Sequence, residues 1–364
     1  MKRLLIGLLA VGCLLVITGG MVGCRAYGPT TIGPDRFDYN ESIAQSWNTQ
    51  LLQNLVRMRY GGTPHFVEVN SILQQYQLEI SSFGGFIANG DGVSGLWEVP
   101  FQLEGMFREA PTITYSPLVG EEFTERLLKP IDPITLIYIS QSGWPVDHLF
   151  EMCVDQVNGI KNRAITGTTK NQASESGLDE FHELLIMLKA MQERGMLDIR
   201  VEQEGSTVVL FVPPAGMSDD EKDLAKRAKQ LLGLSQTATK FTLVTSPVQR
   251  NGMELAVQTK SILTILMGLS RTVMASQEDI EKGYVVEEML MSMSEEVEDH
   301  LLAIYSTNSD PQEAFVKIWF RERYYYISDD DKESKRTFAL LTYLFNLQSR
   351  DTGLMAPLLT LPAG

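Results

Sequence analysis

The chain has 364 residues, of which 44% are hydrophobic and 21% charged, and this balance is typical of a globular protein. The 31 Lys and Arg residues against 46 Asp and Glu give a net charge of -15, which excludes a broad nucleic-acid-binding face and disfavours an acidic lipid surface. Three cysteines cannot build a disulfide framework, and four histidines leave little for a metal site.

The N-terminus has the features of an export signal. Lys2 and Arg3 precede an uncharged run over residues 4–23, and Cys24 follows it. Residues 21–24 (Met-Val-Gly-Cys) resemble the lipobox of bacterial lipoproteins, in which the cysteine receives a diacylglycerol and the signal is cut before it. Cys13 also fits the pattern, but a cut there would leave an apolar run in the mature chain. An uncleaved membrane anchor and a plain secretory signal are the alternatives.

We therefore expect residues 1–23 to be a lipoprotein signal peptide and Cys24 to be the lipid attachment site. Two or three acyl chains attach a protein stably to a membrane. Arg25, in place of the Asp that retains lipoproteins in the inner membrane, favours the outer membrane, with the body facing the periplasm. No later segment is apolar enough to span a bilayer.

The N-terminal third is expected to contain a tether, a helix and a long hairpin. Residues 24–38 include a stretch rich in Pro, Gly and Thr, typical of a tether. A helix capped by Asn40 then carries an apolar stripe up to Gly61-Gly62. The alternating segments 72–86 and 96–107 flank a turn and predict a β-hairpin, with Pro100 at an edge or bulge. This region, residues 39–119, is assigned as one unit.

Residues 120–350 are expected to form an α+β body, with a possible seam at residues 163–177. Together with the preceding unit, this predicts an N-terminal helix and long hairpin, followed by a mixed, mainly antiparallel sheet with packed helices. In chain order the patterns predict a strand at 135–140, a helix at 146–160, a helix at 178–194, a hairpin at 197–201 and 207–212, a charged helix at 218–232, strands at 241–245 and 254–257, a buried helix at 262–274, a hairpin at 315–320 and 324–328, and an amphipathic helix at 332–347. Residues 351–364 form an apolar C-terminal tail, which could clip onto the body or onto a partner.

Asp329, Asp331 and Glu333 are the candidate ligands for a hard cation. They do not match the twelve-residue calcium loop, because Gly and Glu are missing from its sixth and twelfth places. Ser328 with Asp331 also fits a capping box at the start of the last helix, and we favour that interpretation. No metal or other cofactor is therefore predicted.

Other catalytic patterns lack their required context. Gly90, Gly92 and Gly95 fit a dinucleotide fingerprint, but no helix follows them. His182-Glu183 lacks the second histidine of a zinc helix, and Ser94 and Ser270 lack the second glycine of a nucleophile elbow. Cys153 lies on an apolar helical stripe, with His148 expected on the polar side of that helix, which is typical of an inert thiol.

Aromatic residues recur along the chain and could line a ligand groove, although core and cross-strand packing explains them as well. They are Phe37, Trp47, Trp97, Trp144, Trp319 and the run Tyr324 to Tyr326.

Several stretches resemble an uncharacterised family of bacterial lipoproteins. They are Asp38-Tyr39-Asn40-Glu41, Leu55-Val56-Arg57-Met58-Arg59-Tyr60, Pro111 to Leu118 (PTITYSPL), Tyr326 to Asp331 (YISDDD) with Ser334-Lys335, and Leu359-Thr360-Leu361-Pro362. The family has no established activity, so the resemblance implies a location in the cell envelope and no catalytic residue.

The sequence thus favours a non-enzymatic envelope lipoprotein that binds or scaffolds an envelope assembly through a protein partner. One alternative is an envelope hydrolase or transferase whose acidic residues converge only in the fold. The other is an oligomeric outer-membrane component that inserts the hairpin at residues 72–107.

Overall fold

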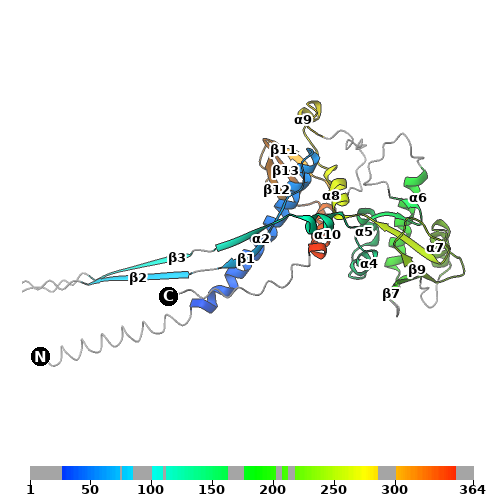
Figure 1. Cartoon of the computed structure of the whole chain (residues 1–364), viewed down its shortest axis with the longest axis horizontal. Coiled ribbons are helices and arrows are strands. Elements are labelled where there is room, and N and C mark those ends of the chain that lie inside the picture. Colours follow the sequence, from blue (N-terminus) through cyan, green and yellow to red (C-terminus); the bar gives the residue numbers. More distant parts are fainter. Residues whose placement is uncertain are drawn as a thin grey trace, which may run out of the picture. The chain divides into compact units, whose positions relative to one another are not determined.

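The structure, a computed structural model, describes residues 27–73, 76–84, 101–109, 112–162, 176–201, 207–211, 218–285 and 301–349 (Figure 1). These residues form two compact units. The larger unit joins residues up to Pro64 with those from Gly120 onward, and the smaller unit is His65–Val119. Helices packed beside mainly antiparallel strands confirm the predicted α+β class.

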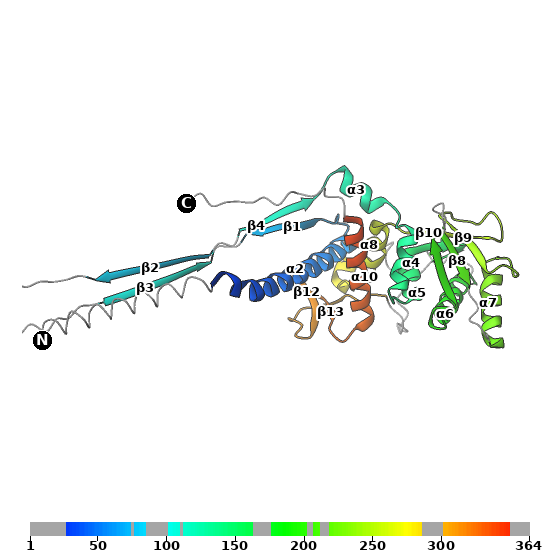
Figure 2. The same cartoon turned by 90° about the horizontal axis from the view of Figure 1, so that it is seen from below.

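A six-stranded mixed sheet forms one part of the larger unit. Its order is β6-β5-β10-β9-β8-β7, and β9 and β10 run parallel while the other neighbours are antiparallel. The strands are β5 (Val154–Val157), β6 (Ile160–Lys161), β7 (Leu197–Val201), β8 (Thr207–Phe211), β9 (Lys240–Val244) and β10 (Glu254–Thr259). Figure 2 shows helices beside this sheet, namely α4 (Pro133–Gln141), α5 (Val146–Cys153), α6 (Ser176–Glu193) and α7 (Asp219–Leu231).

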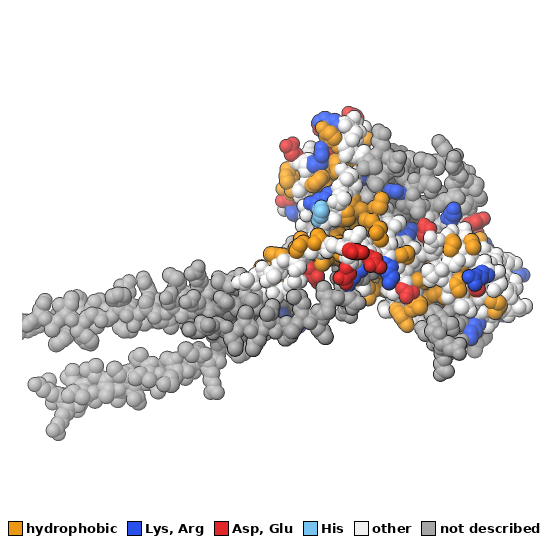
Figure 3. All heavy atoms as spheres, in the orientation of Figure 1, with side chains coloured by type: hydrophobic (Ala, Val, Ile, Leu, Met, Phe, Trp, Pro, Cys, Tyr) orange, Lys and Arg blue, Asp and Glu red, His pale blue; other side chains and the backbone are white. Residues whose placement is uncertain are grey.

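A three-stranded antiparallel sheet and five helices form the rest of the larger unit. The sheet order is β11-β13-β12, with β11 (Tyr305–Thr307), β12 (Ala314–Phe320) and β13 (Arg323–Ser328). The helices are α2 (Tyr27–Arg59), α3 (Glu121–Leu128), α8 (Ile262–Ser270), α9 (Gln277–Glu281) and α10 (Lys332–Ser349). The buried stripe Leu51, Leu52, Leu55 and Val56 lets α2 pack against α8 and β12. On the face in Figure 3, acidic and basic side chains of the described residues are interspersed with apolar ones.

The smaller unit consists of paired strands. β1 (Phe66–Leu73) pairs antiparallel with β4 (Thr112–Leu118), and β2 (Tyr76–Gly84) pairs antiparallel with β3 (Phe101–Glu109). This confirms the long hairpin and extends it beyond residues 72 and 107. Pro100 lies just before β3, outside the described residues.

Two predictions at the N-terminus were wrong. The helix α2 begins at Tyr27, so the described part of the tether at 24–38 is helical and Asn40 does not cap it. Pro29 lies in the first turn, where a missing N–H costs no intrahelical bond, and extending a helix is easier than nucleating one. In addition, α2 belongs to the larger unit, not with the hairpin, because its apolar stripe packs there.

Two predictions in the body also need correction. Residues 135–140 form α4, not a strand, because the Asp132 carboxylate accepts a hydrogen bond from the Ile134 N–H at 3.0 Å and Pro133 opens the helix. The helix predicted over 146–160 ends at Cys153, and Val154–Val157 joins the sheet as β5. The backbone N–H and C=O groups of this segment pair with those of β10, and this pairing satisfies them in the sheet instead of in a longer helix. The seam proposed at 163–177 lies largely outside the described residues, and Ser176 and Gly177 open α6.

The remaining predicted elements of the body are confirmed. The helix at 178–194, the hairpin at 197–212, the charged helix after Ser218, the two strands near 241 and 254, the buried helix from Ile262, the hairpin at 315–328 and the last helix all lie within one to four residues of their predicted bounds.

Candidate functional site

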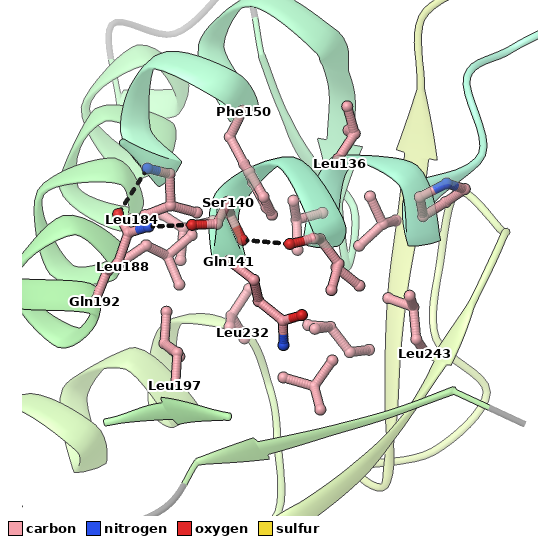
Figure 4. Close-up of a pocket in the computed structure, with 17 residues that line it drawn as sticks. Leu136, Ser140, Gln141, Phe150, Leu184, Leu188, Gln192, Leu197, Leu232 and Leu243 are labelled. Atoms are coloured by element: carbon pink, nitrogen blue, oxygen red, sulfur yellow. Dashed lines mark hydrogen bonds between the residues drawn. The ribbon is translucent and has the colours of Figure 1, made fainter. Parts of the chain in front are cut away.

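An apolar cavity of about 150 Å³ lies between the six-stranded sheet and the helices α4, α5 and α6 (Figure 4). Leu136 and Ile137 of α4, Phe150 of α5, and Leu184 and Leu188 of α6 line the helical side. Aliphatic side chains from five strands line the opposite side. The walls are thus the facing apolar stripes of the helices and the sheet, which leave a gap where they meet.

A part-buried network of hydrogen bonds around the Gln192 amide lies at one end of this cavity. Gln192 Nε2 donates to the carbonyl oxygens of Ser140 at 3.2 Å and Trp144 at 2.9 Å, and its Oε1 accepts from the Val146 N–H at 2.8 Å. Figure 4 shows two of these bonds, between Gln192 and both Ser140 and the neighbouring helix. Gln192 therefore fixes the end of α4 to the start of α5.

The polar side chains of the cavity are few. The Ser140 hydroxyl donates to the Ile137 carbonyl oxygen at 2.8 Å, so its hydrogen is used within α4. Gln141 is exposed, and Figure 4 shows its amide directed into the space between Leu232 and Leu243. Every lining residue is Pro, Leu, Ile, Val, Phe, Ser or Gln. Such a lining is chemically suited to an uncharged apolar group.

The three acidic candidates point to separate partners. Asp329 Oδ1 lies 2.7 Å from Lys335 Nζ, and Glu333 accepts hydrogen bonds from Arg336 at 2.8 Å. Asp331 accepts from both the N–H and the hydroxyl of Ser334. Among the described residues, no group of three His, Cys, Asp or Glu side chains is placed to hold a metal ion.

The segment does cap the last helix, as we favoured, but the capping residue is Asp331 and not Ser328. Asp331 directly precedes α10 and its Oδ1 accepts the Ser334 N–H at 3.0 Å, so Asp331 is the cap. Ser328 instead donates its hydroxyl to Asp330 Oδ1 at 2.5 Å. A carboxylate at this position satisfies a free amide and also complements the helix dipole, which explains the preference.

Cys153 and His148 do not form a nucleophile and base. Cys153 is fully buried, and burial raises the pKa of its thiol to about 12. His148 is buried, contrary to the prediction that it lies on the polar side of α5, and burial lowers its pKa. Its Nε2 lies 3.0 Å from the Thr337 hydroxyl, and α10 thus covers the helix face that the sequence pattern left open.

Lys260 is a buried ionisable group that the sequence analysis missed. It lies between β10 and α8 and is 2% exposed, and its Nζ donates to the Glu151 carbonyl oxygen at 3.2 Å. Burial lowers the pKa of this lysine to about 8. In the sequence, Lys260 stands between an apolar strand and the capping residue Ser261. Exposed lysines are common at such positions, so the sequence did not indicate that this one is buried.

The other singled-out residues have structural partners or lie outside the described residues. Glu183 pairs with Arg227 at 3.0 Å, and the buried Ser270 hydroxyl donates to the Met267 carbonyl oxygen. Residues outside the described ranges are Cys13, Cys24, Gly90, Gly92, Ser94, Gly95, Trp97 and the tail at 351–364.

Several of the described aromatic candidates pack against other aromatic side chains, whereas Phe37 is exposed. The ring centroids are 5.0 Å apart for Trp47 and Phe345, and 6.1 Å apart for Trp144 and Tyr343. Trp319 and Tyr324 form a cross-strand pair at 4.6 Å. These contacts agree with the interpretation that the rings pack within the fold, and they do not form a ligand groove.

Comparison of the chain with known protein families, with curated proteins and with solved structures gives no match. Among the described helices, none combines the length and the apolar character needed to cross a membrane.

Proposed function

We propose that this protein is a lipid-anchored envelope protein that binds or scaffolds an envelope assembly and carries out no reaction of its own. The signal sequence and Cys24 support the anchoring at the outer membrane, with the body facing the periplasm. The observation that carries the binding role is the uncovered apolar face of the β1–β4 pair, which we call the arm face.

The register of β1 and β4 gathers apolar residues on this face. Ile72 lies opposite Ile113, Val69 opposite Tyr115, and Val67 opposite Pro117, and opposed residues of an antiparallel pair share a face. The irregularity between Val69 and Ser71 inserts one residue and keeps Ile72 in step with Ile113. Hence the bulge preserves the apolar face where simple alternation would lose it.

The middle of the opposite face is polar, although the buried Phe66 lies opposite Leu118 at one end of it. Glu68 lies opposite Ser116 and Ser71 opposite Thr114, and Asn70 Nδ2 donates to Ser116 Oγ at 2.6 Å. The arm face is therefore the more apolar side along the middle of the ribbon, where the other side carries Glu68, Ser71 and Thr114.

The apolar side chains of the arm face are accessible. Val67 is 40% exposed, Ile113 is 38% exposed and Tyr115 is 60% exposed. A two-stranded ribbon is marginally stable in water, and it leaves an unpaired edge on each strand. A partner that covers the arm face or adds a strand to an edge would supply the missing burial, as in β-augmentation.

The test is photo-crosslinking in intact cells with a benzophenone amino acid placed at Tyr115 on the arm face. We expect a discrete adduct with an envelope protein. The matched control places the same probe at Thr114, which is exposed and next in sequence but on the polar face. A Cys24→Ala chain, which cannot be lipidated, should lose both the membrane attachment and the adduct.

Equal crosslinking from positions 114 and 115, or no adduct from either in a membrane-attached protein, would contradict this proposal. Catalytic turnover of a wall or lipid substrate by the purified chain would also contradict it. Among the described residues nothing favours the hydrolase or transferase alternative, because the acidic candidates are each bound to a separate basic or capping partner.

The register of β2 and β3 favours the second candidate function, in which the hairpin enters the outer membrane within an oligomer. Leu78 lies opposite Phe107 and Ser82 opposite Leu103, whereas Gln77 lies opposite Arg108 on the alternate face. Each strand has nine residues, the length of a membrane-spanning strand. Single cysteines at positions 78 and 79, labelled with an environment-sensitive dye, test it. Insertion predicts a lipid-like signal at 78 only, and identical aqueous signals would exclude it.

A further inference from the structure

We infer that the apolar cavity between the six-stranded sheet and the helices α4, α5 and α6 binds one small, uncharged molecule built on a single hydrocarbon ring. This inference does not depend on the proposed scaffold role, because the cavity belongs to the larger unit and the arm face to the smaller one. It rests on the volume of the cavity, the chemistry of its walls and the side chains at its rim.

The volume of the cavity sets the size of the guest. It is about 150 Å³, and a protein cavity of about this volume that is lined by Leu, Ile and Phe stays dry and binds benzene. Folded cores rarely retain a space larger than a water molecule, because empty volume destabilises the fold. Here Val157, Val209 and Val257 stand at the sheet wall, where a larger aliphatic side chain would fill part of the space. A retained space of this size points to a guest of one ring.

The walls select an uncharged guest. Among the described residues, the lining is Pro, Leu, Ile, Val and Phe apart from Ser140, Gln141 and Gln192. The Ser140 hydroxyl donates to the Ile137 carbonyl oxygen, and the Gln192 amide uses both its nitrogen and its oxygen within the protein. Gln141 is exposed at the rim and has an interaction partner of its own. A buried water needs about two to four polar partners, so a hydrocarbon occupies this space at a lower cost than water or a charged group.

The rim gives a small guest a way in. Leu136 and Leu184 on the helical side are buried, whereas Leu197 of β7 and Leu243 of β9 are half-buried. In Figure 4 these two half-buried leucines lie on the sheet side of the space. The guest therefore enters past them. Because Gln192 holds α4 to α5, the space is formed before the guest arrives, which lowers the entropic cost of binding.

The experiment is a titration of the full-length Cys24→Ala chain with benzene, followed by NMR of isotope-labelled Ile, Leu and Val methyl groups. We expect saturable shifts of the Ile137 and Val257 methyl signals at one benzene per chain. The Val316 methyl signals, in the core beside the three-stranded sheet, should not shift with them. Every titration uses the same detergent, so that partition of benzene into micelles is common to all chains.

Two tryptophan variants test the location of the site. Leu243→Trp at the half-buried rim should weaken benzene binding at least about tenfold, because the indole fills the space. Ile186→Trp is the matched control, because Ile186 lies on α6 between the lining residues Leu184 and Leu188 but is 56% exposed and does not line the cavity. It should change binding less than about twofold. Circular dichroism of each variant verifies that it is folded.

Guests of other charge and size test the parent chain alone, so they decide the matter even if Leu243→Trp does not fold. Toluene should give the same shifts as benzene, whereas benzoate, which has a similar shape but a charge, should give none. Adamantane, which is equally apolar but a cage of several fused rings, should bind at least about tenfold more weakly than toluene. The inference is overturned if benzene gives no saturable shift, if a folded Leu243→Trp chain binds it as well as the parent, or if benzoate or adamantane binds as well as toluene.

Discussion

Lys260 places an ammonium group in the interior of the larger unit, with the Glu151 carbonyl oxygen as its hydrogen-bond acceptor. Burial lowers its pKa to about 8, against 10.5 in an exposed lysine. At pH 7 the group is charged in both the folded and the unfolded chain, so the folded state bears a desolvation cost of about 3 kcal/mol, since each pKa unit corresponds to about 1.4 kcal/mol.

Replacing Lys260 by methionine should therefore stabilise the protein. We expect Lys260→Met to raise the free energy of unfolding at pH 7 by about 1–2 kcal/mol in urea denaturation, after the loss of one hydrogen bond is taken into account. The control is Lys161→Met on β6, where the lysine is exposed and the change should be under about 0.5 kcal/mol. A less stable Lys260→Met chain would mean that the ammonium group is needed in the fold.

His148 makes stability depend on pH in a definite direction. The Thr337 hydroxyl donates to the Leu301 carbonyl oxygen, so His148 Nε2–H must donate to Thr337 Oγ1. Burial lowers the pKa of His148, and nearby Glu333 opposes this shift only in part. Below pH 6.5 the unfolded chain then binds a proton that the folded chain does not bind, so the free energy of unfolding falls as the pH drops from 6.5 toward the folded pKa.

The check is urea denaturation at pH 7.5 and 5.5. His148→Gln keeps an N–H donor at the Nε2 position and should reduce the difference between the two pH values. The control is His182→Gln, because His182 is exposed on α6, and this change should leave the difference unaltered. An unaltered difference in His148→Gln would assign the pH dependence to other groups.

At the scale of the element, substitutions at the start of α10 can distinguish a helix cap from a cation site. Asp331→Ala should cost about 1 kcal/mol of stability, because the Ser334 N–H loses its acceptor. Asp331→Asn should retain most of it, since asparagine caps equally well. Asp223→Ala, at an exposed position of α7, is the control. Millimolar Ca²⁺ should leave the melting temperature unchanged, and a rise that disappears in Asp331→Asn would restore the metal interpretation.

The junction of α4 and α5 depends on Gln192. Gln192→Leu removes three hydrogen bonds and leaves the Val146 N–H and two carbonyl groups to be solvated or strained. We expect the free energy of unfolding to fall by about 1–3 kcal/mol in urea denaturation, because these buried or part-buried groups lose their partners. Glu193→Leu, exposed and adjacent, should change the free energy of unfolding by less than about 0.5 kcal/mol. Full stability of Gln192→Leu would show that packing alone holds the junction.

Elements with a strong local signal could be predicted, and those decided by distant contacts could not. The Ser218 capping box and the Ser261 cap fix the starts of α7 and α8 from local sequence. In α4, the β-branched run after Pro133 resembled a strand, although Asp132-Pro133 already carried the helix signal. The change from helix to strand at Val154 depends on β10, about a hundred residues later in the chain.

The candidate site was beyond sequence reasoning for the same reason. Gln192 acts on groups 46 to 52 residues away, and nothing in its own segment distinguishes it from a surface glutamine. The cavity exists because side chains from three helices and five strands do not quite fill the space between them. Periodicity can place each of these residues on an apolar face, but it does not give the volume between faces.

At the scale of the whole molecule, the packing of α2 links the two ends of the sequence. Its buried residues contact α8 and β12, and Trp47 makes an edge-to-face contact with Phe345 near the end of α10. At a synthesis rate of about 5–20 residues per second, roughly 10–40 s separate the appearance of Leu55 from that of Ile262, where α8 begins. Throughout that interval the apolar stripe of α2 lacks the α8 and β12 surfaces that cover it in the folded chain, so the nascent helix must be kept from aggregating until they emerge.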